Sequence, residues 1–314
     1  MRVAGVLLLG SWMCAVAAAA GAEEAPVQIR WLGVAGFSLT AGDTTILHDP
    51  YLSRPGILET LFTFYQPDEE LLEELVSAEG PAPELGRASV ILIGHSHFDH
   101  LGDAPWFAQR SDGPWIAGSP TTVNVSVGYG VSADRARVIN PNQVFDIGPF
   151  RVRAVESRHA LTFAGGSPPA GTVDEPPDAP IHSWSFKLGD ARGWLVTHRE
   201  SGYRVFLLSS AGRHLPSLNA LAAEGVSVDV LLAAAVSADE TYAEDLVRTL
   251  RPRWVVPHHF DYFFTPVRDP DAGAPVDEDD VAAFEAKVRA AAEAEGVELS
   301  VERPRLFERL ELGG

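Results

Sequence analysis

The alternation of apolar and polar residues predicts a chain built from short strands and amphipathic helices. Three β-rich runs separated by glycines begin at Val27. The nearly continuous apolar run at residues 88–93 stops at Gly94, as a strand buried on both faces does. Apolar residues at helical spacing follow Pro67 and predict a helix over residues 68–78. Strands are predicted at residues 27–32, 36–39, 44–47, 88–93, 143–145, 150–155, 183–188, 193–197, 204–208, 229–232 and 254–256.

The second half of the chain alternates between strands and helices. Further helices are predicted near residues 215–224, 238–250 and 277–295. Residues 165–180 are rich in proline, glycine and acidic side chains, which predicts a loop. No internal repeat or break in composition marks a second domain. Because two strand-rich halves each close with β/α units, the pattern favours an α/β fold in which two sheets pack face to face with helices outside.

The first 22 residues have the features of a secretory signal peptide. Met1 and Arg2 precede an apolar segment, and the small residues around Ala20 and Ala22 fit the cleavage pattern of signal peptidase. The alternative is an uncleaved membrane anchor, which the acidic residues at positions 23 and 24 disfavour. We therefore expect an exported protein, periplasmic or extracellular, whose mature domain spans residues 23–314.

Composition narrows the class of protein. Hydrophobic residues make up 46% of the chain and charged residues 21%, as in globular proteins. The one cysteine lies within the first 22 residues, so we expect no disulfide in the mature chain, and no later stretch is long and apolar enough to span a bilayer. The formal net charge of −19 disfavours nucleic acids and anionic membranes as partners. The expected partner is a small-molecule substrate, on which the local field of a metal site acts more strongly than net charge.

The segment His95-Ser96-His97-Phe98-Asp99-His100 carries the clearest chemistry. It directly follows the buried strand, and three imidazoles and a carboxylate are too many polar groups for a core without partners. In an extended turn His95 and His97 point the same way, so that both rings can bind one ion, while Asp99 and His100 face a neighbouring position. The alternative is a solvated histidine-rich loop, but the ordered H-x-H-x-D-H pattern after an apolar strand favours a metal site.

This pattern resembles the signature of the metallo-β-lactamase superfamily, and the resemblance extends over most of the mature chain. Residues 31–37 (WLGVAGF) look like the opening strand–turn–strand of the family, and His48-Asp49-Pro50 is similar to the D-P of its lactonase and phospholipase D-like branches. His159 falls where the family supplies a third histidine. The late strand that ends in His258-His259 falls where it supplies the last one, and His259 matches the ligand position better than His258.

The resemblance implies a four-layer αββα sandwich with metals at the sheet edge, and metal-assisted hydrolysis. Carried over residue by residue, one metal would be held by His95, His97 and His159, and a second by Asp99, His100 and His259. Zinc lowers the pKa of a bound water from about 15.7 to about 7. Asp99 would orient the resulting hydroxide and shuttle a proton to the leaving group. The same kinds of ligand also accept manganese and iron.

One position departs from the family pattern. The family usually has an aspartate that bridges both metals, and Ser210, in the segment Ser209-Ser210-Ala211-Gly212, stands in its place. A neutral hydroxyl bridges two dications far less well than a carboxylate. We therefore expect the first site to fill firmly and the second only weakly or partly. Three acidic residues are conceivable substitutes for the missing carboxylate: Asp49, Glu200 and Asp261.

Other candidate residues carry weaker signals. Ser209 lacks the G-x-S-x-G context of a nucleophile. The isolated histidines at 182, 198 and 214 are expected to lie outside the metal site. The aromatic residues Phe260, Tyr262, Phe263 and Phe264 either wall a substrate pocket or, more commonly for such a cluster, belong to the core.

The sequence therefore predicts an exported metal-dependent hydrolase that acts on an ester, a lactone or a phosphodiester of modest size. It resembles the lactonase-like branch more than the antibiotic-hydrolysing enzymes. The alternative from another class is a non-catalytic binding protein that keeps the fold and a single metal, which Ser210 favours and the intact motif at 95–100 disfavours. A β-lactamase proper is a second enzymatic alternative, and it predicts turnover of nitrocefin.

Overall fold

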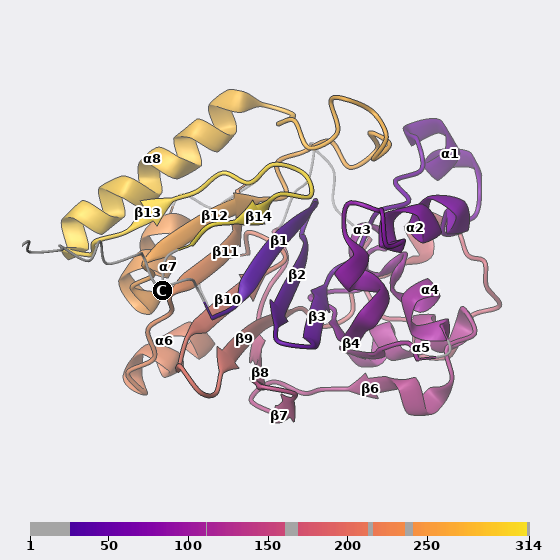
Figure 1. Ribbon diagram of the computed structural model, residues 1–314, viewed down its shortest axis with the longest axis horizontal. Coiled ribbons are helices and arrows are strands. Elements are labelled where there is room, and N and C mark those ends of the chain that lie inside the picture. Colours follow the sequence, from indigo (N-terminus) through magenta and orange to yellow (C-terminus); the bar gives the residue numbers. More distant parts are fainter. Residues whose placement is uncertain (1–25, 111, 161–168, 213–215, 236–240, 313–314) are drawn as a thin grey trace, which may run out of the picture.

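The computed structural model describes residues 26–110, 112–160, 169–212, 216–235 and 241–312, in which two seven-stranded sheets pack face to face (Figure 1). The first sheet contains, in order across it, β14 (Arg309–Leu310), β1 (Gln28–Gly33), β2 (Gly36–Ala41), β3 (Thr44–His48), β4 (Ala88–Leu92), β5 (Trp115–Gly118) and β6 (Ala136–Val138). The second contains β13 (Ser300–Val301), β12 (Trp254–His258), β11 (Val230–Ala234), β10 (Arg204–Leu208), β9 (Arg192–His198), β8 (Phe150–Glu156) and β7 (Val144–Ile147).

Helices lie outside both sheets, so the molecule has four layers (Figure 1). On the side of the first sheet are α1 (Ile57–Phe62), α2 (Glu69–Val76), α3 (Phe98–Leu101), α4 (Ala104–Gln109) and α5 (Pro120–Gly128). On the side of the second are α6 (Pro216–Ala223), α7 (Tyr242–Leu250) and α8 (Glu278–Glu295). Three short 3-10 helices are η1 (Pro83–Arg87), η2 (Ala133–Arg135) and η3 (Ser183–Ser185). This is the αββα sandwich that the sequence predicts.

Each sheet joins an antiparallel meander to parallel strands. β1 to β3 pair antiparallel and β3 to β6 pair in parallel. In the second sheet, β7 to β10 pair antiparallel and β10 to β13 in parallel. Because β8 and β10 are both antiparallel to β9, β8 runs in the same direction as β10, β11 and β12. The loops that follow these four strands therefore emerge at one edge of the second sheet. The loops that follow the parallel strands β3 and β4 likewise emerge together at one edge of the first sheet.

Along each strand, successive side chains point alternately into two of the three apolar layers of the molecule. In β10, Val205 and Leu207 belong to the core between the sheets, whereas Phe206 and Leu208 pack against the helices of the second side. In β4, Val90 likewise faces the core between the sheets and Ile91 faces the helices of the first side. Three apolar layers thus hold the sheet edge rigid, and loops on such a scaffold can position polar side chains accurately.

Most of the predicted strands and helices are confirmed with bounds shifted by a few residues, and helix ends follow from their sequence. Asp68 caps α2 by accepting a hydrogen bond from Leu71 N at 3.0 Å, and Asp277 caps α8 through Asp279 N at 2.9 Å. α8 ends at Gly296, whose φ of +59° lies in the left-handed region that glycine adopts readily.

The strand predicted at residues 183–188 is wrong. Residues 183–185 form η3, in which His182 Nδ1 accepts a hydrogen bond from Trp184 N and Ser185 N donates to His182 O. These local bonds satisfy backbone groups that a strand would leave for a neighbouring strand. The alternation of Trp184 and Phe186 in the sequence therefore reflects one exposed and one buried ring in a turn.

Several elements have no counterpart in the prediction. β5, β6, α1, α4 and α5 are short, and α5 is rich in β-branched residues that disfavour helix. A capping box between Ser119 and Thr122 nevertheless starts α5. The predicted signal peptide, residue 215, residues 238–240 and residues 165–168 of the predicted loop lie outside the described residues.

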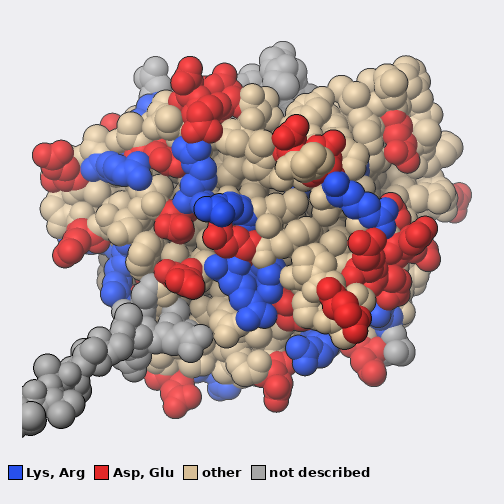
Figure 2. Space-filling model, turned by 45° about the horizontal axis from the view of Figure 1, so that its top comes forward, with Lys and Arg blue, Asp and Glu red and all other residues tan. Residues whose placement is uncertain are grey.

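On the face shown in Figure 2, Lys and Arg side chains are interspersed with Asp and Glu. Among the described residues, no helix combines the length and the apolar character needed to cross a membrane.

Candidate metal centre

The predicted ligands meet at the sheet edge where the relevant strands end. The segment 95–100 follows β4, His159 follows β8 and His259 follows β12. Each ligand residue offers one atom, and within each of two groups these atoms lie within 4.8 Å of one another: His95, His97 and His159 in the first group, and Asp99, His100 and His259 in the second. The two groups adjoin, because the rings of His95 and His100 have centroids 3.8 Å apart.

The first group consists of three imidazoles, two of which bond to backbone carbonyls. His95 Nε2 lies 3.1 Å from His97 Nδ1, and the ring centroids are 4.7–4.9 Å apart. His97 Nε2 donates to Pro169 O at 3.1 Å, and His159 Nδ1 donates to Ala160 O at 2.7 Å. These two bonds fix the tautomer and orientation of the His97 and His159 rings and leave the other nitrogen of each ring available to a metal.

In the second group, His100 stands between two carboxylates. His100 Nδ1 donates to Asp49 Oδ2 at 2.8 Å, and His100 Nε2 lies 3.3 Å from Asp99 Oδ2. His259 Nε2 lies 3.4 Å from the same Asp99 oxygen. Asp49 Oδ1 also accepts a hydrogen bond from Gly94 N at 2.7 Å. Asp49 thus ties the end of β3 to the start of the histidine turn and orients the ring of His100.

Burial keeps the imidazoles of the first group neutral. Loss of solvation lowers the pKa of His159 to about 4, lowers that of His97, and holds that of His95 well below its usual range. Neighbouring histidines lower all three pKa values further. Because a metal binds the neutral form of histidine, this group is ready for a cation at neutral pH.

The second group carries charge. Burial disfavours the cation of His100, but Asp99 and Asp49 outweigh this effect and raise the pKa of His100 to about 10. Although burial also opposes ionisation of Asp99, His100 and His259 hold its pKa well below the usual range. A metal that binds at His100 therefore has to displace a proton, which the first group does not require.

A buried polar cluster lies beneath the histidine turn. Ser209 Oγ is 3.3 Å from His48 Nε2, and His48 Nδ1 donates to Ala35 O at 2.9 Å. A Cβ at position 94 would lie 1.6 Å from Ser209 Oγ, so Gly94 is required for the turn to pack this closely. Ser209, a poor candidate for a nucleophile from its sequence context, is buried in this cluster.

Ser210 lies beside the first group. Its Oγ accepts a hydrogen bond from Ala160 N at 3.1 Å, one residue after His159. The segment that follows packs closely on the same loop, since a Cβ at Gly212 would lie 1.9 Å from Arg158 O. The position that the resemblance assigns to the bridging aspartate is therefore at the site, with a hydroxyl in place of a carboxylate.

Two of the conceivable substitutes for that carboxylate are wrong. Asp261 is buried in an ion pair with Arg54 at 2.9 Å and also accepts a hydrogen bond from Val34 N. Glu200 is exposed in the turn between β9 and β10, at the opposite end of these strands from Ser210. Asp49 lies at the site, but it contacts His100 on the ring nitrogen that points away from Asp99. Sequence reasoning missed this orienting role of Asp49. The position of Asp49 directly after β3, the parallel neighbour of β4, could have indicated it.

Only one imidazole of His258-His259 belongs to the site, as the resemblance implies. His258 is the last residue of β12, is buried, and packs edge-on against Phe37 with centroids 5.2 Å apart. Burial holds the pKa of His258 well below its usual range, so its ring is neutral. His259 has a φ of +59°, and its N donates to Val34 O at 2.9 Å. This turn directs the His259 ring to Asp99 instead of into the core.

The donor set fits a divalent cation. His100 Nε2 is buried and lies 3.3 Å from Asp99 Oδ2 in an ion pair, without a hydrogen bond of good geometry among the described residues. A bond to a metal would satisfy this buried nitrogen. Imidazoles and a carboxylate are ligands of zinc, and manganese and iron accept the same types.

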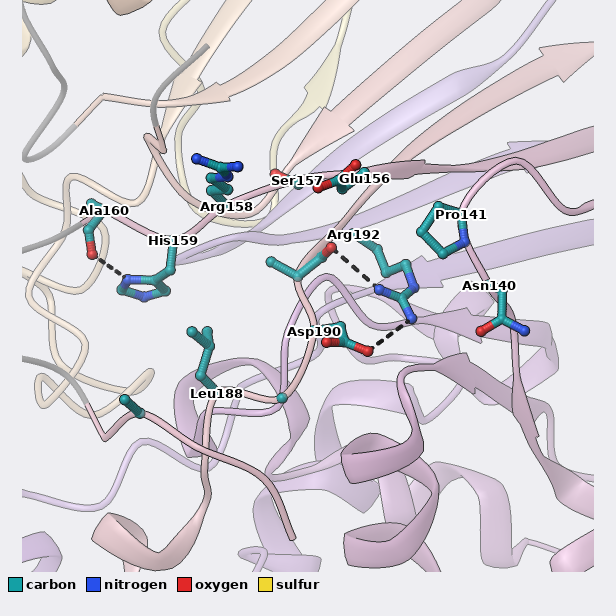
Figure 3. A pocket seen from close by; sticks show the side chains of 13 residues that line it. Asn140, Pro141, Glu156, Ser157, Arg158, His159, Ala160, Leu188, Asp190 and Arg192 are labelled. Atoms are coloured by element: carbon teal, nitrogen blue, oxygen red, sulfur yellow. Dashed lines mark hydrogen bonds and ion pairs between the residues drawn. The ribbon is translucent and has the colours of Figure 1, made fainter. Parts of the chain in front are cut away.

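A cavity of about 690 Å³ opens beside the first group (Figure 3). His159 lines one part of it, and Figure 3 shows Arg192 in another part with its guanidinium directed to Asp190. Arg192 Nη2 lies 3.6 Å from Asp190 Oδ2, and Arg192 Nε donates to Ile139 O at 2.9 Å. The volume is in the range of small-molecule sites.

The aromatic segment after the last histidine is divided between the core and the site. Phe260 is buried against Trp31, with ring centroids 5.1 Å apart. Phe263 lies edge-on to His259 at 6.3 Å and contacts Phe264 at 4.3 Å. The core interpretation is therefore confirmed for Phe260, whereas Phe263 borders the second group. Of the isolated histidines, His182 and His198 bond elsewhere, to Leu61 O and Ser201 Oγ, and residue 214 lies outside the described residues.

Comparison with known proteins gives matches in both sequence and structure. A family model described as a β-lactamase superfamily domain matches residues 28–259, which include all six candidate ligands. A UPF0173 metal-dependent hydrolase from Cupriavidus taiwanensis is 26% identical over 287 residues, covering 83% of this chain and 87% of the relative. A protein of the same name from Polynucleobacter asymbioticus is 24% identical over 280 residues, covering 82% and 85%.

Solved structures share the fold at lower identity. Igni18, a metallo hydrolase from Ignicoccus hospitalis, has a TM-score of 0.55 and 16% identity, covering 90% of this chain and 97% of its own. CmlA, a diiron β-hydroxylase from Streptomyces venezuelae, has a TM-score of 0.56 and 17% identity, covering 91% of this chain and 54% of its own. At these identities the likeness concerns the αββα architecture alone.

Proposed function

Because this chain belongs to the metallo-β-lactamase superfamily, we propose that it is an exported metal-dependent hydrolase that cleaves an ester, a lactone or a phosphodiester of modest size. The observation that carries the proposal is the convergence of six ligand atoms, from three separate segments, into two adjoining groups. Relatives named metal-dependent hydrolases, which match over more than four fifths of the chain, support it.

In this proposal the first metal is held by His95, His97 and His159, and the second by Asp99, His100 and His259. When bound, a metal lowers the pKa of water to about 7 and polarises the carbonyl or phosphoryl oxygen of the substrate. Zinc is the proposed ion, and manganese or iron would suit the same ligands.

Asp99 is the proposed proton carrier. Contacts with His100 and His259 keep the Asp99 carboxylate ionised, so it can accept a hydrogen bond from the attacking water and orient it. During attack the carboxylate would take the proton of the water, and a carboxyl group with so low a pKa would then give this proton to the departing oxygen. Asp99 is only slightly exposed, which limits competition from bulk water.

The two sites are proposed to fill unequally, with one firm metal and one weaker. At the position of the bridging carboxylate, Ser210 contributes a neutral hydroxyl that accepts a hydrogen bond from Ala160 N. Asp49 bonds to His100 and Gly94, so both of its oxygens are engaged. Two dications would therefore repel one another with less negative charge between them.

The substrate is proposed to be a small molecule, since the cavity beside His159 has room for one. Export is proposed from the apolar segment in residues 1–22. Cell fractionation and N-terminal sequencing test it: we expect the protein in the periplasm or medium, beginning at Glu23. Recovery of the unprocessed chain in the cytosol would contradict export.

A substrate panel tests the hydrolase. Protein loaded with zinc or manganese is assayed on p-nitrophenyl acetate, a γ-lactone and bis(p-nitrophenyl) phosphate. We expect turnover of at least one substrate, its loss in His97→Ala, and its retention in His198→Ala, which changes a histidine bonded to Ser201 away from the site. Equal turnover in His97→Ala would show that another site acts. Turnover of nitrocefin would favour a β-lactamase instead.

A non-catalytic binding protein with a single metal is the second candidate, and Ser210 is the observation that favours it. It predicts one firmly held ion and no turnover of any substrate in the panel. Turnover that requires His97 would exclude this candidate.

A further inference from the structure

Exposed large hydrophobic side chains gather on one part of the surface. Of the ten such side chains among the described residues, seven lie at Trp184, at Tyr262 or within residues 57–64. α1 buries only Thr60, and its Leu58 and Phe62, one helical turn apart, are 69% and 78% exposed. A helix in a monomeric soluble protein normally turns such residues inward, so a patch of this kind marks a binding surface.

Local contacts join these residues into one surface. His182 Nε2 donates to Leu61 O at 3.0 Å, and Phe64, 62% exposed, pairs with His182 in an isolated antiparallel bridge. Trp184, 44% exposed, follows in η3 and donates through its N to the His182 ring. We refer to residues 57–64, Trp184 and Tyr262 as the apolar strip.

Ring contacts link the apolar strip to the candidate metal centre through Phe98, a buried residue inside the H-x-H-x-D-H motif. The ring of Phe98 contacts Trp184 edge-on, with centroids 6.5 Å apart, and stacks on Phe264 at 6.4 Å. Phe264 in turn contacts Tyr262 at 5.3 Å. Both exposed rings are therefore one or two contacts from the ring between the candidate ligands His97 and Asp99.

The charges around the apolar strip restrict what it binds. Glu59 on α1 is exposed, and Asp68, Glu69 and Glu70 begin the next helix. An anionic bilayer would be repelled by these carboxylates, whereas a neutral hydrocarbon group would not.

We propose that the apolar strip binds the hydrophobic acyl or alkyl group of the substrate, so that long-chain esters or lactones are preferred to short-chain ones. The proposal rests on the proposed function. The substrate is the occupant to which the structure points, because the strip continues into the ligand motif, and a chain lying on it would bring its polar end to Asp99 and His259. Burial of each methylene stabilises the complex by about 0.8 kcal/mol, which is a fourfold gain in kcat/KM.

The test compares p-nitrophenyl acetate, hexanoate and decanoate in three forms of the metal-loaded protein. These are the unmodified chain, Leu58→Ser/Phe62→Ser, and the matched control Val138→Ser/Val144→Ser, whose valines are 40% and 52% exposed on β6 and β7. All four side chains are exposed, so none of the substitutions removes core packing. We expect the decanoate-to-acetate ratio of kcat/KM to fall at least tenfold in Leu58→Ser/Phe62→Ser and to stay unchanged in the control.

A second readout does not depend on turnover. The neutral dye Nile red is bound to the metal-free protein and then displaced with decanol. We expect the affinities for both the dye and decanol to fall in Leu58→Ser/Phe62→Ser and in neither of the other two forms. If no ester is cleaved but this difference remains, the hydrolase proposal fails on these substrates and the apolar-ligand proposal stands. Equal chain-length ratios in all three forms overturn the strip proposal. Two further results would also overturn it. If the unmodified chain is a dimer by light scattering and Leu58→Ser/Phe62→Ser is not, the occupant is a second copy. If the unmodified chain sediments with phosphatidylcholine vesicles and this variant does not, the occupant is a bilayer.

Discussion

The two groups of candidate ligands differ in what stands behind their imidazoles. In the first group, His97 and His159 bond to backbone carbonyls, and the rings are neutral. In the second group, His100 bonds to the carboxylate of Asp49 and faces that of Asp99. One six-residue motif thus supplies two sites with opposite electrostatics, because the tertiary contacts of each ring decide its charge.

This difference has a consequence for metal binding. A dication enters the first group without displacing a proton, whereas at the second group it competes with the proton on His100. The second group also lacks a carboxylate at Ser210. We expect both effects to make the first group the tighter site, and each can be changed separately.

Removing one ligand from each group has the largest expected effect. We expect His159→Ala to lower kcat/KM about a thousandfold and to remove the firmly bound metal, because several kcal/mol of charge stabilisation are lost. His259→Ala should cost about 100-fold or less. Steady-state kinetics and elemental analysis of the purified variants measure both. A larger loss in His259→Ala would reverse the comparison between the groups.

Asp49→Asn removes the carboxylate that supports His100 of the second group, while the amide oxygen can still accept the hydrogen bond from Gly94 N. The amide keeps the shape but not the charge that orients and polarises His100, so affinity for the second metal should fall about 10–100-fold while the first is unaffected. Metal titration by calorimetry checks this. Asp146→Asn, which alters an exposed carboxylate paired with Arg151, is the control. An equal effect on both metals would mean that Asp49 supports the whole edge of the sheet.

Ser210→Asp should bring the two groups closer in affinity. A carboxylate at this position adds a negative charge between two dications, and we expect affinity for the second metal to rise about tenfold. Ser210→Asn is the matched control, because asparagine is similar in size to aspartate but is neutral. Two tightly held ions in the unmodified protein would contradict the inequality from which this prediction starts.

Acid should destabilise the metal-free protein through the first group. The pKa of His159 is about 4 in the folded state against an ordinary value of 6.5, so the unfolded chain binds more protons between these values and stability is lost as pH falls from 6.5 towards 4. From pH 7.5 to 5.5 this residue alone should lower the free energy of unfolding by about 1 kcal/mol. His100, with its pKa raised to about 10, acts oppositely: its contribution is complete below pH 6.5 and is lost as pH rises towards 10.

Urea unfolding at the two pH values measures this effect, and His159→Gln serves as the comparison. The pH-dependent loss should be smaller in His159→Gln than in the unmodified chain. An equal loss in both would show that His159 titrates normally in the folded protein.

The candidate ligands could be predicted from the sequence, because the ends of the strands that they follow could be predicted from it. The apolar run 88–93 ends at the motif, and the β-rich run 254–256 ends just before His258-His259, so pattern alone places these imidazoles after strands. The choice of His259 over His258 came from the family resemblance and agrees with the geometry. The roles of Asp49, Asp261 and Glu200 were not accessible, because they depend on which strands are neighbours and on which end of a strand a turn occupies.

The sequence by itself determined the alternation of strands and helices, the two strand-rich halves and the residues able to bind a metal, because these follow from side-chain periodicity and chemistry over a few neighbouring positions. Only the tertiary structure decided which carboxylate touches which imidazole, where a cavity opens, and that α1 presents Leu58 and Phe62 outward. Charge states and exposure are set by groups brought together across the sandwich, and distance in space is not encoded in distance along the chain.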